Sequence, residues 1–224
     1  MHKTKVLLLC ASPRRVGTSA MLLRRVQQVC GGELLFLYSL RDKGKAVHLM
    51  AQADRIVLSG PCYINSYLAV VSELMEEVAA SGLEKSGQSL YGIINGGMPY
   101  PHTHRHGLTA LELFADAMGM RWQGGFVLGA GVILDGKPLE HHPLARKTVP
   151  AFAAFCEHIR NGTTAPDALY EGVQIRFNPL MTRLMAAMLN RRVNKHIRSF
   201  GHDPYALNAY INPMNTAHGA GKAL

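Results

Sequence analysis

The chain has 224 residues, and 48% of them are hydrophobic, which is enough for one domain with a substantial core and an additional segment. Its formal net charge is +9 at pH 7, but aromatic residues make up only 7% of the chain and do not alternate with the basic ones, which argues against a nucleic-acid stacking surface. The positive charge also argues against a small acidic electron carrier, and it suits the binding of phosphorylated nucleotides.

Nothing in the sequence indicates export or insertion into a membrane. The first residues, MHKTK, lead into an apolar strand without the pattern of a signal peptide, and no apolar run approaches the roughly 20 residues that span a bilayer. The cysteines form no Cys-x-x-Cys pair, which argues against a zinc site and a disulfide framework. They are Cys10, Cys30, Cys62 and Cys156. We therefore expect a cytoplasmic, reduced protein without a metal site.

In chain order, short apolar segments alternate with segments whose apolar residues recur at helical spacing. The predicted strands are residues 6–10, 33–38, 55–59, 90–95 and a last one that begins at 126. The predicted helices begin near residue 20 and then cover 46–53, 68–80, 108–118 and 143–159. This alternation predicts a doubly wound α/β domain with a parallel sheet over residues 1–160.

The most informative stretch is ASPRRVGTS, residues 11–19, which joins the first strand to the first helix. A helix start offers free backbone N–H groups and a positive dipole end, and this loop adds hydroxyls, the cation of Arg14 and the glycine Gly17, which together suit a phosphate monoester. Thr18 or Ser19 is placed to cap the helix. Neither GxxxxGK[ST] nor GxGxxG is present. The alternative is an ordinary capped loop that binds no ligand.

Two further loops follow the third and fourth strands. They are GPCYINSY, residues 60–67, and Asn95-Gly96-Gly97. In an open parallel sheet, ligands bind beyond the carboxyl ends of the strands near the switch point, so we expect these loops to meet the first one in a single crevice. Tyr63 is either a lid over a ligand or a loop tyrosine that merely packs. A lone cysteine such as Cys62 is more often a small hydrophobe than a redox group.

The segment 98–107, MPYPHTHRHG, contains three histidines at alternate positions. They are His102, His104 and His106. A metal site here needs a carboxylate or cysteine from elsewhere, so the favoured interpretation is a solvated loop at the mouth of the crevice, from which one histidine could donate to a ligand.

The chain after residue 160 does not continue the α/β pattern. Residues 161–167 form a polar linker, and from Pro179 the sequence PLMTRLMAAMLNRRVNKHI predicts an amphipathic helix. We expect this extension, residues 161–224, to dock on the domain or on a second copy. A peripheral membrane contact is the less favoured alternative, and the residues from 202 onward either wrap a partner or fray.

The first loop, SPRxxGTS in this chain, resembles the phosphate loop, usually GSPRxxGNS, of the flavodoxin-like NAD(P)H-dependent FMN reductases, which include quinone, azo and chromate reductases and iron–sulfur flavoproteins. The second loop is similar to the family's TPxYxxS pattern at Pro61, Tyr63, Asn65 and Ser66. The resemblance covers residues 1–160, and the cysteine cluster of the iron–sulfur flavoproteins is absent. It implies a flavodoxin-like doubly wound five-stranded parallel sheet of order 2-1-3-4-5, here followed by a helical C-terminal extension.

The resemblance also implies the cofactor FMN, with NADPH or NADH as the hydride donor, and a small electron acceptor such as a quinone, flavin, azo or nitro compound or metal ion. It implies ping-pong kinetics without a side-chain acid or base, and a homodimer or homotetramer. The implied phosphate-binding residues are Ser12, Arg14, Gly17, Thr18, Ser19 and Ala20. The implied residues around the flavin ring are Pro61, Cys62, Tyr63, Ile64, Asn65, Ser66, Asn95, Gly96 and Gly97. The alternatives are a non-catalytic FMN-binding electron-transfer protein and a membrane- or partner-binding module.

Overall fold

The structure is a computed structural model that describes residues 4–82, 87–173, 175 and 178–205. The chain divides into two compact units, Met1–Arg176 and Phe177–Leu224. The first unit extends beyond the predicted boundary at residue 160, because Ala165 and Tyr170 are buried in its core.

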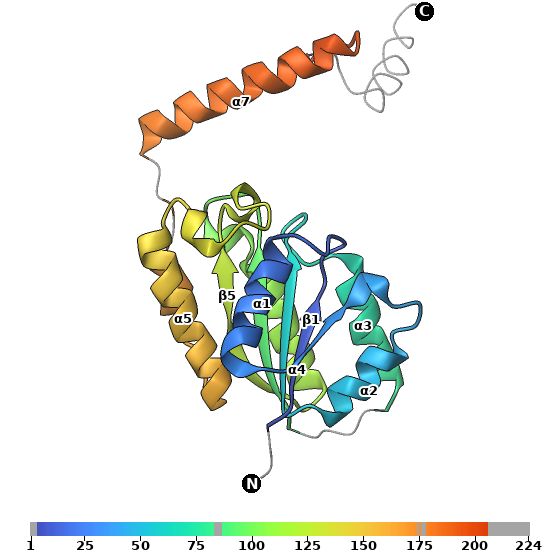
Figure 1. Cartoon of the computed structure of the whole chain (residues 1–224). Helices are drawn as coiled ribbons and strands as arrows, with labels where there is room; N and C mark the ends of the chain where they lie inside the picture. Colours follow the sequence, from blue (N-terminus) through green and yellow to red (C-terminus); the bar gives the residue numbers. More distant parts are fainter. Residues whose placement is uncertain (1–3, 83–86, 174, 176–177, 206–224) are drawn as a thin grey trace, which may run out of the picture. The chain divides into compact units, whose positions relative to one another are not determined.

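All strands of the first unit form one parallel sheet in the order β2-β1-β3-β4-β5 (Figure 1). The strands are β1 Val6–Cys10, β2 Glu33–Phe36, β3 Arg55–Pro61, β4 Ser89–Asn95 and β5 Arg121–Leu128. This order is the flavodoxin-like topology, in which the direction of winding reverses between β1 and β3. The predicted fold class is therefore confirmed.

Helices cover both faces of this sheet. They are α1 Thr18–Cys30, α2 Gly44–Gln52, α3 Ala69–Ala80, α4 Arg105–Ala117, α5 Ala145–Asn161 and α6 Ala168–Glu171. Short 3₁₀ turns lie at Leu37–Ser39, Pro101–Thr103, Gly131–Ile133 and Leu139–His141. The helices α1 and α5 lie on one face of the sheet, and α2 and α3 lie on the other (Figure 1). The buried residues of α1 and α5 belong to one hydrophobic cluster and those of α2 and α3 to another, so the sheet separates two cores.

The interior strand β1 is buried along its whole length because both of its faces are covered. Leu8 and Cys10 contribute to one cluster, and Leu7 and Leu9 contribute to the other. A strand that is buried on both faces needs apolar residues at every position rather than at alternate ones. This requirement explains the uninterrupted VLLLC run in the sequence.

The predicted start of the last strand is wrong, because β5 begins at Arg121 rather than at residue 126. The register between β4 and β5 shifts between Leu90 and Gly92. Gly124 lies at this irregularity with a φ of +91°, a left-handed conformation that favours glycine. A bulge with a glycine interrupts the apolar pattern, so the sequence hides the first half of the strand.

Outside the sheet, the second unit contains the helix α7, Pro179–Ser199. Its N-terminus is capped by Asn178, whose side-chain oxygen accepts a hydrogen bond of 2.7 Å from the Met181 amide. No helix in the described part of the chain is long and apolar enough to cross a membrane.

The two halves of α7 present different chemistry on the same side. Arg191 follows Leu184 by seven residues, and Lys195 follows Met188 by the same interval, which is about two helical turns. Basic side chains therefore continue the face that begins with Leu and Met, instead of lying opposite to it. This arrangement differs from a membrane-surface helix, which keeps its cations on the face opposite its apolar residues.

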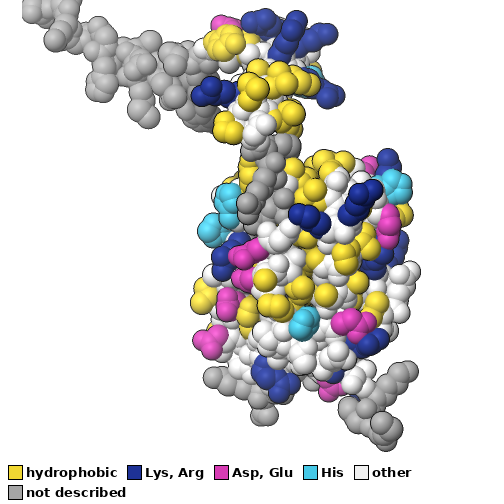
Figure 2. Space-filling view, turned by 90° about the vertical axis from the view of Figure 1, so that its left-hand side faces the viewer, with side chains coloured by type: hydrophobic (Ala, Val, Ile, Leu, Met, Phe, Trp, Pro, Cys, Tyr) yellow, Lys and Arg dark blue, Asp and Glu magenta, His cyan; other side chains and the backbone are white. Residues whose placement is uncertain are grey.

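The first unit does not carry a uniform charge on the side that Figure 2 shows. Lys and Arg side chains are interspersed there with Asp and Glu side chains (Figure 2). A polyanion requires a continuous basic surface for tight binding, which this side does not offer.

Candidate functional site

The predicted loops meet in a cavity of about 120 Å³ at the carboxyl edge of the sheet. The cavity is lined by Ser12, Arg14, Gly17, Thr18, Ser19, Pro61, Cys62, Tyr63, Asn95, Gly96, Gly97, Val132 and Asp135. The candidate residues that do not line it are Ala20, Ile64, Asn65 and Ser66. Two lining residues, Val132 and Asp135, were not among the candidates and come from the segment after β5.

Asn95 at the end of β4 connects the loops that form this cavity. Its side-chain amide donates hydrogen bonds to the Ser19 hydroxyl at 2.7 Å and to the Gly60 carbonyl at 3.1 Å. Its side chain is buried, where an unpaired amide is costly. The Ser59 hydroxyl adds a 3.2 Å hydrogen bond to the Ser19 carbonyl. Asn95 therefore fixes the start of α1 relative to β3 and β4.

The start of α1 is not capped in the way that the sequence suggests. Gly17 is the N-cap residue, and no side chain among the described residues caps the helix. The Thr18 hydroxyl instead donates to the Gly131 carbonyl at 2.9 Å, and Ser19 accepts from Asn95, so the predicted cap at Thr18 or Ser19 is wrong. Both hydroxyls are used in tertiary contacts, and the first-turn amides keep their capacity to bind an anion.

The cation of the first loop, Arg14, is paired with a carboxylate. Its guanidinium forms an ion pair with Asp135 and donates to the Val16 carbonyl at 3.3 Å. The backbone amide of Arg14 donates to the Ser12 hydroxyl at 3.2 Å, which holds the loop in a tight turn. The hydrogen bond and the charge of Arg14 hold the pKa of Asp135 below its usual value, so this carboxylate is ionised at neutral pH.

The loop after β3 ends in a two-residue turn. The Tyr63 amide donates to the Ser66 carbonyl at 2.9 Å, and the intervening Ile64 and Asn65 have φ values of 51° and 66°. Asparagine tolerates this left-handed conformation, but a β-branched residue pays for it with steric strain. Tyr63 is 54% exposed and Ile64 is 98% exposed, so both side chains project from the cavity rim instead of filling it.

Cys62 behaves as a partly buried thiol. Its amide donates to the Asn95 carbonyl at 2.7 Å. Burial raises the pKa of the Cys62 thiol, although a hydrogen bond from the Asn65 backbone opposes this effect. A thiol with a raised pKa forms little of the reactive thiolate at neutral pH, which agrees with the interpretation of Cys62 as a small hydrophobe.

The three histidines do not lie together in a solvated loop, so this prediction is wrong. Pro101–Thr103 forms a 3₁₀ turn, His106 already lies within α4, and His104 is only 3% exposed. The His104 ring occupies the space where a side chain on Gly96 would be, since a Cβ there would lie 2.2 Å from its Cε1 atom. In the described part of the chain, no three His, Cys, Asp or Glu residues are grouped to hold a metal ion.

Two buried histidines support the backbone beneath the cavity rim. His104 Nε2 donates to the Met98 carbonyl at 3.1 Å, and His142 Nε2 donates to the Gly129 carbonyl at 3.0 Å. The Ala130 amide also donates to the Met98 carbonyl at 2.8 Å, which joins the segments after β4 and β5. Burial lowers the pKa of both His104 and His142, so each ring is held in its neutral form. No pattern in the sequence indicates a role for His142.

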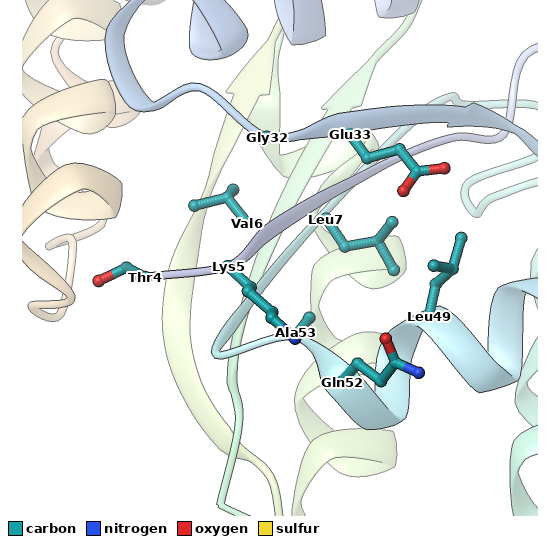
Figure 3. A pocket seen from close by; sticks show the side chains of 9 residues that line it. All are labelled: Thr4, Lys5, Val6, Leu7, Gly32, Glu33, Leu49, Gln52 and Ala53. Atoms are coloured by element: carbon teal, nitrogen blue, oxygen red, sulfur yellow. The ribbon is translucent and has the colours of Figure 1, made fainter. Parts of the chain in front are cut away.

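A larger cavity of about 440 Å³ lies at the opposite, amino edge of the sheet (Figure 3). Its lining residues are Thr4, Lys5, Val6, Leu7, Gly32, Glu33, Leu49, Gln52 and Ala53. The side chains of Leu7 and Leu49 extend into the space between β1 and α2 (Figure 3). Ligands of open parallel sheets bind at the carboxyl ends of the strands, and none of the predicted loops reaches this edge.

Solved structures of reductases have a similar backbone. The apo form of an NADH:FMN oxidoreductase matches with a TM-score of 0.57 and 16% identity, covering 75% of this chain and 94% of that chain. An NADPH-quinone reductase from P. pentosaceus matches with a TM-score of 0.55 and 20% identity, covering 70% of this chain and 99% of that chain. An FMN-dependent NADH-azoreductase from Bacillus anthracis, in complex with FMN, matches with a TM-score of 0.53 and 12% identity, covering 70% of this chain and 100% of that chain.

No protein-family model matches the sequence, and no curated protein matches it either. The likeness to the solved structures is therefore one of backbone arrangement rather than of residues. Together with the strand order β2-β1-β3-β4-β5, these comparisons show that the chain has the flavodoxin-like fold, which it shares with NAD(P)H-dependent reductases of this structural group.

Proposed function

We propose that the protein is an FMN-dependent oxidoreductase, in which NADH or NADPH reduces bound FMN and the flavin then reduces a small acceptor. The observation that carries this proposal is the single cavity in which the uncapped start of α1, the Arg14 loop and the loops after β3 and β4 meet. It lies at the switch point of a fold whose solved neighbours include an NADH:FMN oxidoreductase and an FMN-dependent azoreductase.

The size of the cavity suits one part of FMN. At about 120 Å³, it is smaller than the roughly 300–1,000 Å³ of typical small-molecule sites, but a phosphate group is far smaller than such ligands. The amides of the first turn of α1, including Ala20, would bind the phosphate with Arg14 and the Ser12 hydroxyl. Thr18 would contribute its backbone amide, because its hydroxyl already donates to Gly131.

The ring system of FMN would lie on the rim, where apolar side chains are exposed. Tyr63 and Val132, which line the cavity, are 54% and 65% exposed, and they come from the segments after β3 and β5. Exposed apolar side chains gathered around one cavity indicate a surface that is covered in the working protein. A planar aromatic ligand is a suitable cover because it buries these side chains without any change in the backbone.

Few backbone donors of the rim remain for the flavin ring. The amides of Cys62, Tyr63 and Gly96 donate within the protein to the carbonyls of Asn95, Ser66 and Leu128. Gly97 has no such acceptor among the described residues, and a Cβ on it would meet only Val132, at 3.6 Å. The Gly97 amide would therefore donate to the ring atoms where negative charge gathers on reduction.

FMN, when bound, supplies the hydride and electron chemistry. The chain then has three tasks, which are to bind the phosphate, to present one face of the ring to NAD(P)H and the acceptor in turn, and to stabilise the reduced ring through Gly97. No side-chain acid or base is needed. Cys62, whose pKa is raised, takes no part.

The finer features of the proposal rest on the resemblance in the first loops. The acceptor would be a quinone, flavin, azo or nitro compound or metal ion, and the enzyme would be a homodimer or homotetramer with ping-pong kinetics. Arg14 is paired with Asp135 and selects neither NADPH nor NADH by itself. Initial-rate kinetics with both nucleotides and sedimentation of the purified protein test these features.

Visible spectra test the function itself. The spectrum is recorded for the purified protein, after addition of FMN, and after anaerobic addition of NADH or NADPH. A bound flavin whose absorbance bleaches with the nicotinamide alone supports the reductase. A flavin that stays oxidised until a separate reductase is added indicates an electron carrier, and a protein that takes up no FMN contradicts the proposal.

A further inference from the structure

A carboxylate lies in the cavity that is proposed to bind a phosphate. Asp135 belongs to the segment between β5 and α5, lines the cavity, and forms an ion pair with Arg14. An anion at this place opposes the binding of another anion. The cation that the first loop offers to a ligand is thus already neutralised by the chain.

The position of Asp135 does not depend on this ion pair alone. The Thr18 hydroxyl donates to the Gly131 carbonyl at 2.9 Å, which ties the same segment to the start of α1. A Cβ on Gly136 would lie only 3.3 Å from the Gly17 backbone, so the two backbones are in close approach. The segment would therefore keep Asp135 beside the cavity even if the pair with Arg14 were broken.

We propose that Asp135 is an exchangeable counter-ion for Arg14 and sets how strongly the cavity prefers a phosphate monoester over the same ligand without its phosphate. This inference rests on the proposed function, in which the cavity holds the phosphate of FMN. The phosphate takes the place of Asp135 beside the guanidinium, and Asp135 is the specificity-determining residue because its charge lowers the affinity for the dianion.

Two effects of Asp135 oppose each other, and their sizes decide the direction. As a partner, Asp135 orients Arg14, but the two side chains are 59% and 64% exposed, and exposed ion pairs contribute little. As a charge, it repels a ligand that carries about two negative charges at close range, and this repulsion acts in every bound state. The repulsion is the larger effect, so removal of the charge strengthens binding.

The test measures the dissociation constants of FMN and riboflavin for the wild type and for Asp135→Asn, by flavin fluorescence quenching at low ionic strength. Asparagine keeps the shape of the side chain and tolerates the φ of 47° at this position. The FMN dissociation constant is expected to fall about three- to tenfold, and that of riboflavin is expected to stay unchanged.

The matched control is Glu140→Gln. Glu140 pairs with Arg25 at 2.5 Å and also links the segment after β5 to α1, but neither residue lines the cavity. This variant is expected to leave both dissociation constants unchanged. In the double variant Arg14→Gln with Asp135→Asn, FMN affinity should lie below that of Asp135→Asn, because the cation is lost, and above that of Arg14→Gln, because the repelling charge is lost as well.

The outcomes separate this inference from the proposed function. If the wild type binds FMN more tightly than riboflavin and Asp135→Asn does not strengthen FMN binding, the counter-ion role is wrong and the proposed function stands. An equal gain in riboflavin affinity in Asp135→Asn also contradicts the counter-ion role. If Asp135→Asn binds FMN where the wild type binds none, the counter-ion role is supported, and if neither binds FMN, both ideas fail.

Discussion

The two edges of the sheet carry cavities of opposite character. The amino-edge cavity is the larger, at about 440 Å³ against about 120 Å³. It is lined by the ends of β1 and β2 and by the end of α2, with Lys5 and Glu33 as its charged residues. The carboxyl-edge cavity is smaller, but it is formed by four segments and contains a helix start, hydroxyls and the Arg14–Asp135 pair.

This difference shows that convergence of donors, rather than volume, marks the candidate site. Parallel strands bring four chain segments to one edge in the same orientation, and at the carboxyl edge Asn95 joins three of them by hydrogen bonds. The amino edge has space without such a connection. Substitutions at the two edges should therefore have unequal effects on ligand binding.

The largest effect is expected for Asn95→Ala. The variant loses the hydrogen bonds to Ser19 and Gly60 and leaves these buried groups unpaired, which costs about 2 kcal/mol or more of the free energy of unfolding. FMN affinity should fall more than about tenfold, because a misplaced α1 start no longer matches the loops. Urea unfolding and FMN titration measure the two effects. Gln52→Ala at the amino edge is the control, and equal losses in both variants would contradict the comparison.

A smaller effect is expected for Arg14→Gln. This change removes the cation of the first loop, whose side chain is 59% exposed, so the free energy of unfolding should change little. The preference for FMN over riboflavin should fall about tenfold, since a charge-assisted contact to the phosphate is lost. Paired titrations give this ratio. Lys5→Gln at the amino edge should leave the preference for FMN over riboflavin unchanged. An equal loss of this preference in Lys5→Gln would contradict the placement of the phosphate at the carboxyl edge.

Stability should decrease as the pH falls below about 6.5. Burial lowers the pKa of His104 and His142 in the folded chain, whereas in the unfolded chain these groups take up a proton near their ordinary pKa of about 6.5. The unfolded state therefore binds more protons below that pH, and its population grows until the pH falls past the lowered folded values. Urea unfolding at pH 7.5 and 5.5 measures the difference.

The histidine responsible can be identified with a matched pair of variants. His104→Gln removes the buried ring that packs against Gly96, and it should weaken this pH dependence as well as lower stability. His102→Gln changes an exposed neighbour in the same turn, so the pH dependence should remain. If the pH dependence of stability is unchanged both in His104→Gln and in His142→Gln, groups other than these two histidines cause it.

The smallest effect is expected for Ile64→Asn. The φ of Ile64 is 51°, which is unfavourable for a β-branched residue and tolerated by asparagine. The variant should gain up to about 1 kcal/mol in the free energy of unfolding. Ile133→Asn is the control, because Ile133 is 58% exposed but lies in a 3₁₀ turn without a positive φ. A gain in the control as large as that in Ile64→Asn would refute the role of strain.

Much of the fold could be predicted because its signals are local. The VLLLC run of β1 and the alternation of apolar strands with helices require only periodicity, and parallel pairing then brings the loop after each strand to the same edge. The first half of β5 was not predictable, because Gly124 at the bulge breaks the pattern. Its register depends on β4, which is far away in the sequence.

Several residues that line the candidate cavity could be predicted from the sequence, but their contacts could not. The sequence predicts Ser19 and Asn95 as ligand-binding residues, and in the structure the Asn95 amide donates a hydrogen bond to the Ser19 hydroxyl. The sequence does not predict Asp135 because the segment after β5 has no motif and is brought to the cavity by tertiary contacts, among them the hydrogen bond from Thr18 to Gly131 and the close approach of Gly136 to Gly17. The role of His104 was hidden because burial depends on how α4 packs.

The most direct test of the central claim is an NMR titration of the ¹⁵N-labelled protein with FMN, followed through the backbone amides. The largest shifts are expected at Thr18, Ser19 and Gly97, and almost none at Gly32 and Gln52. Riboflavin should shift Gly97 and leave Thr18 and Ser19 nearly unchanged. Shifts concentrated at Gly32 and Gln52 would place the ligand at the amino edge and contradict the account.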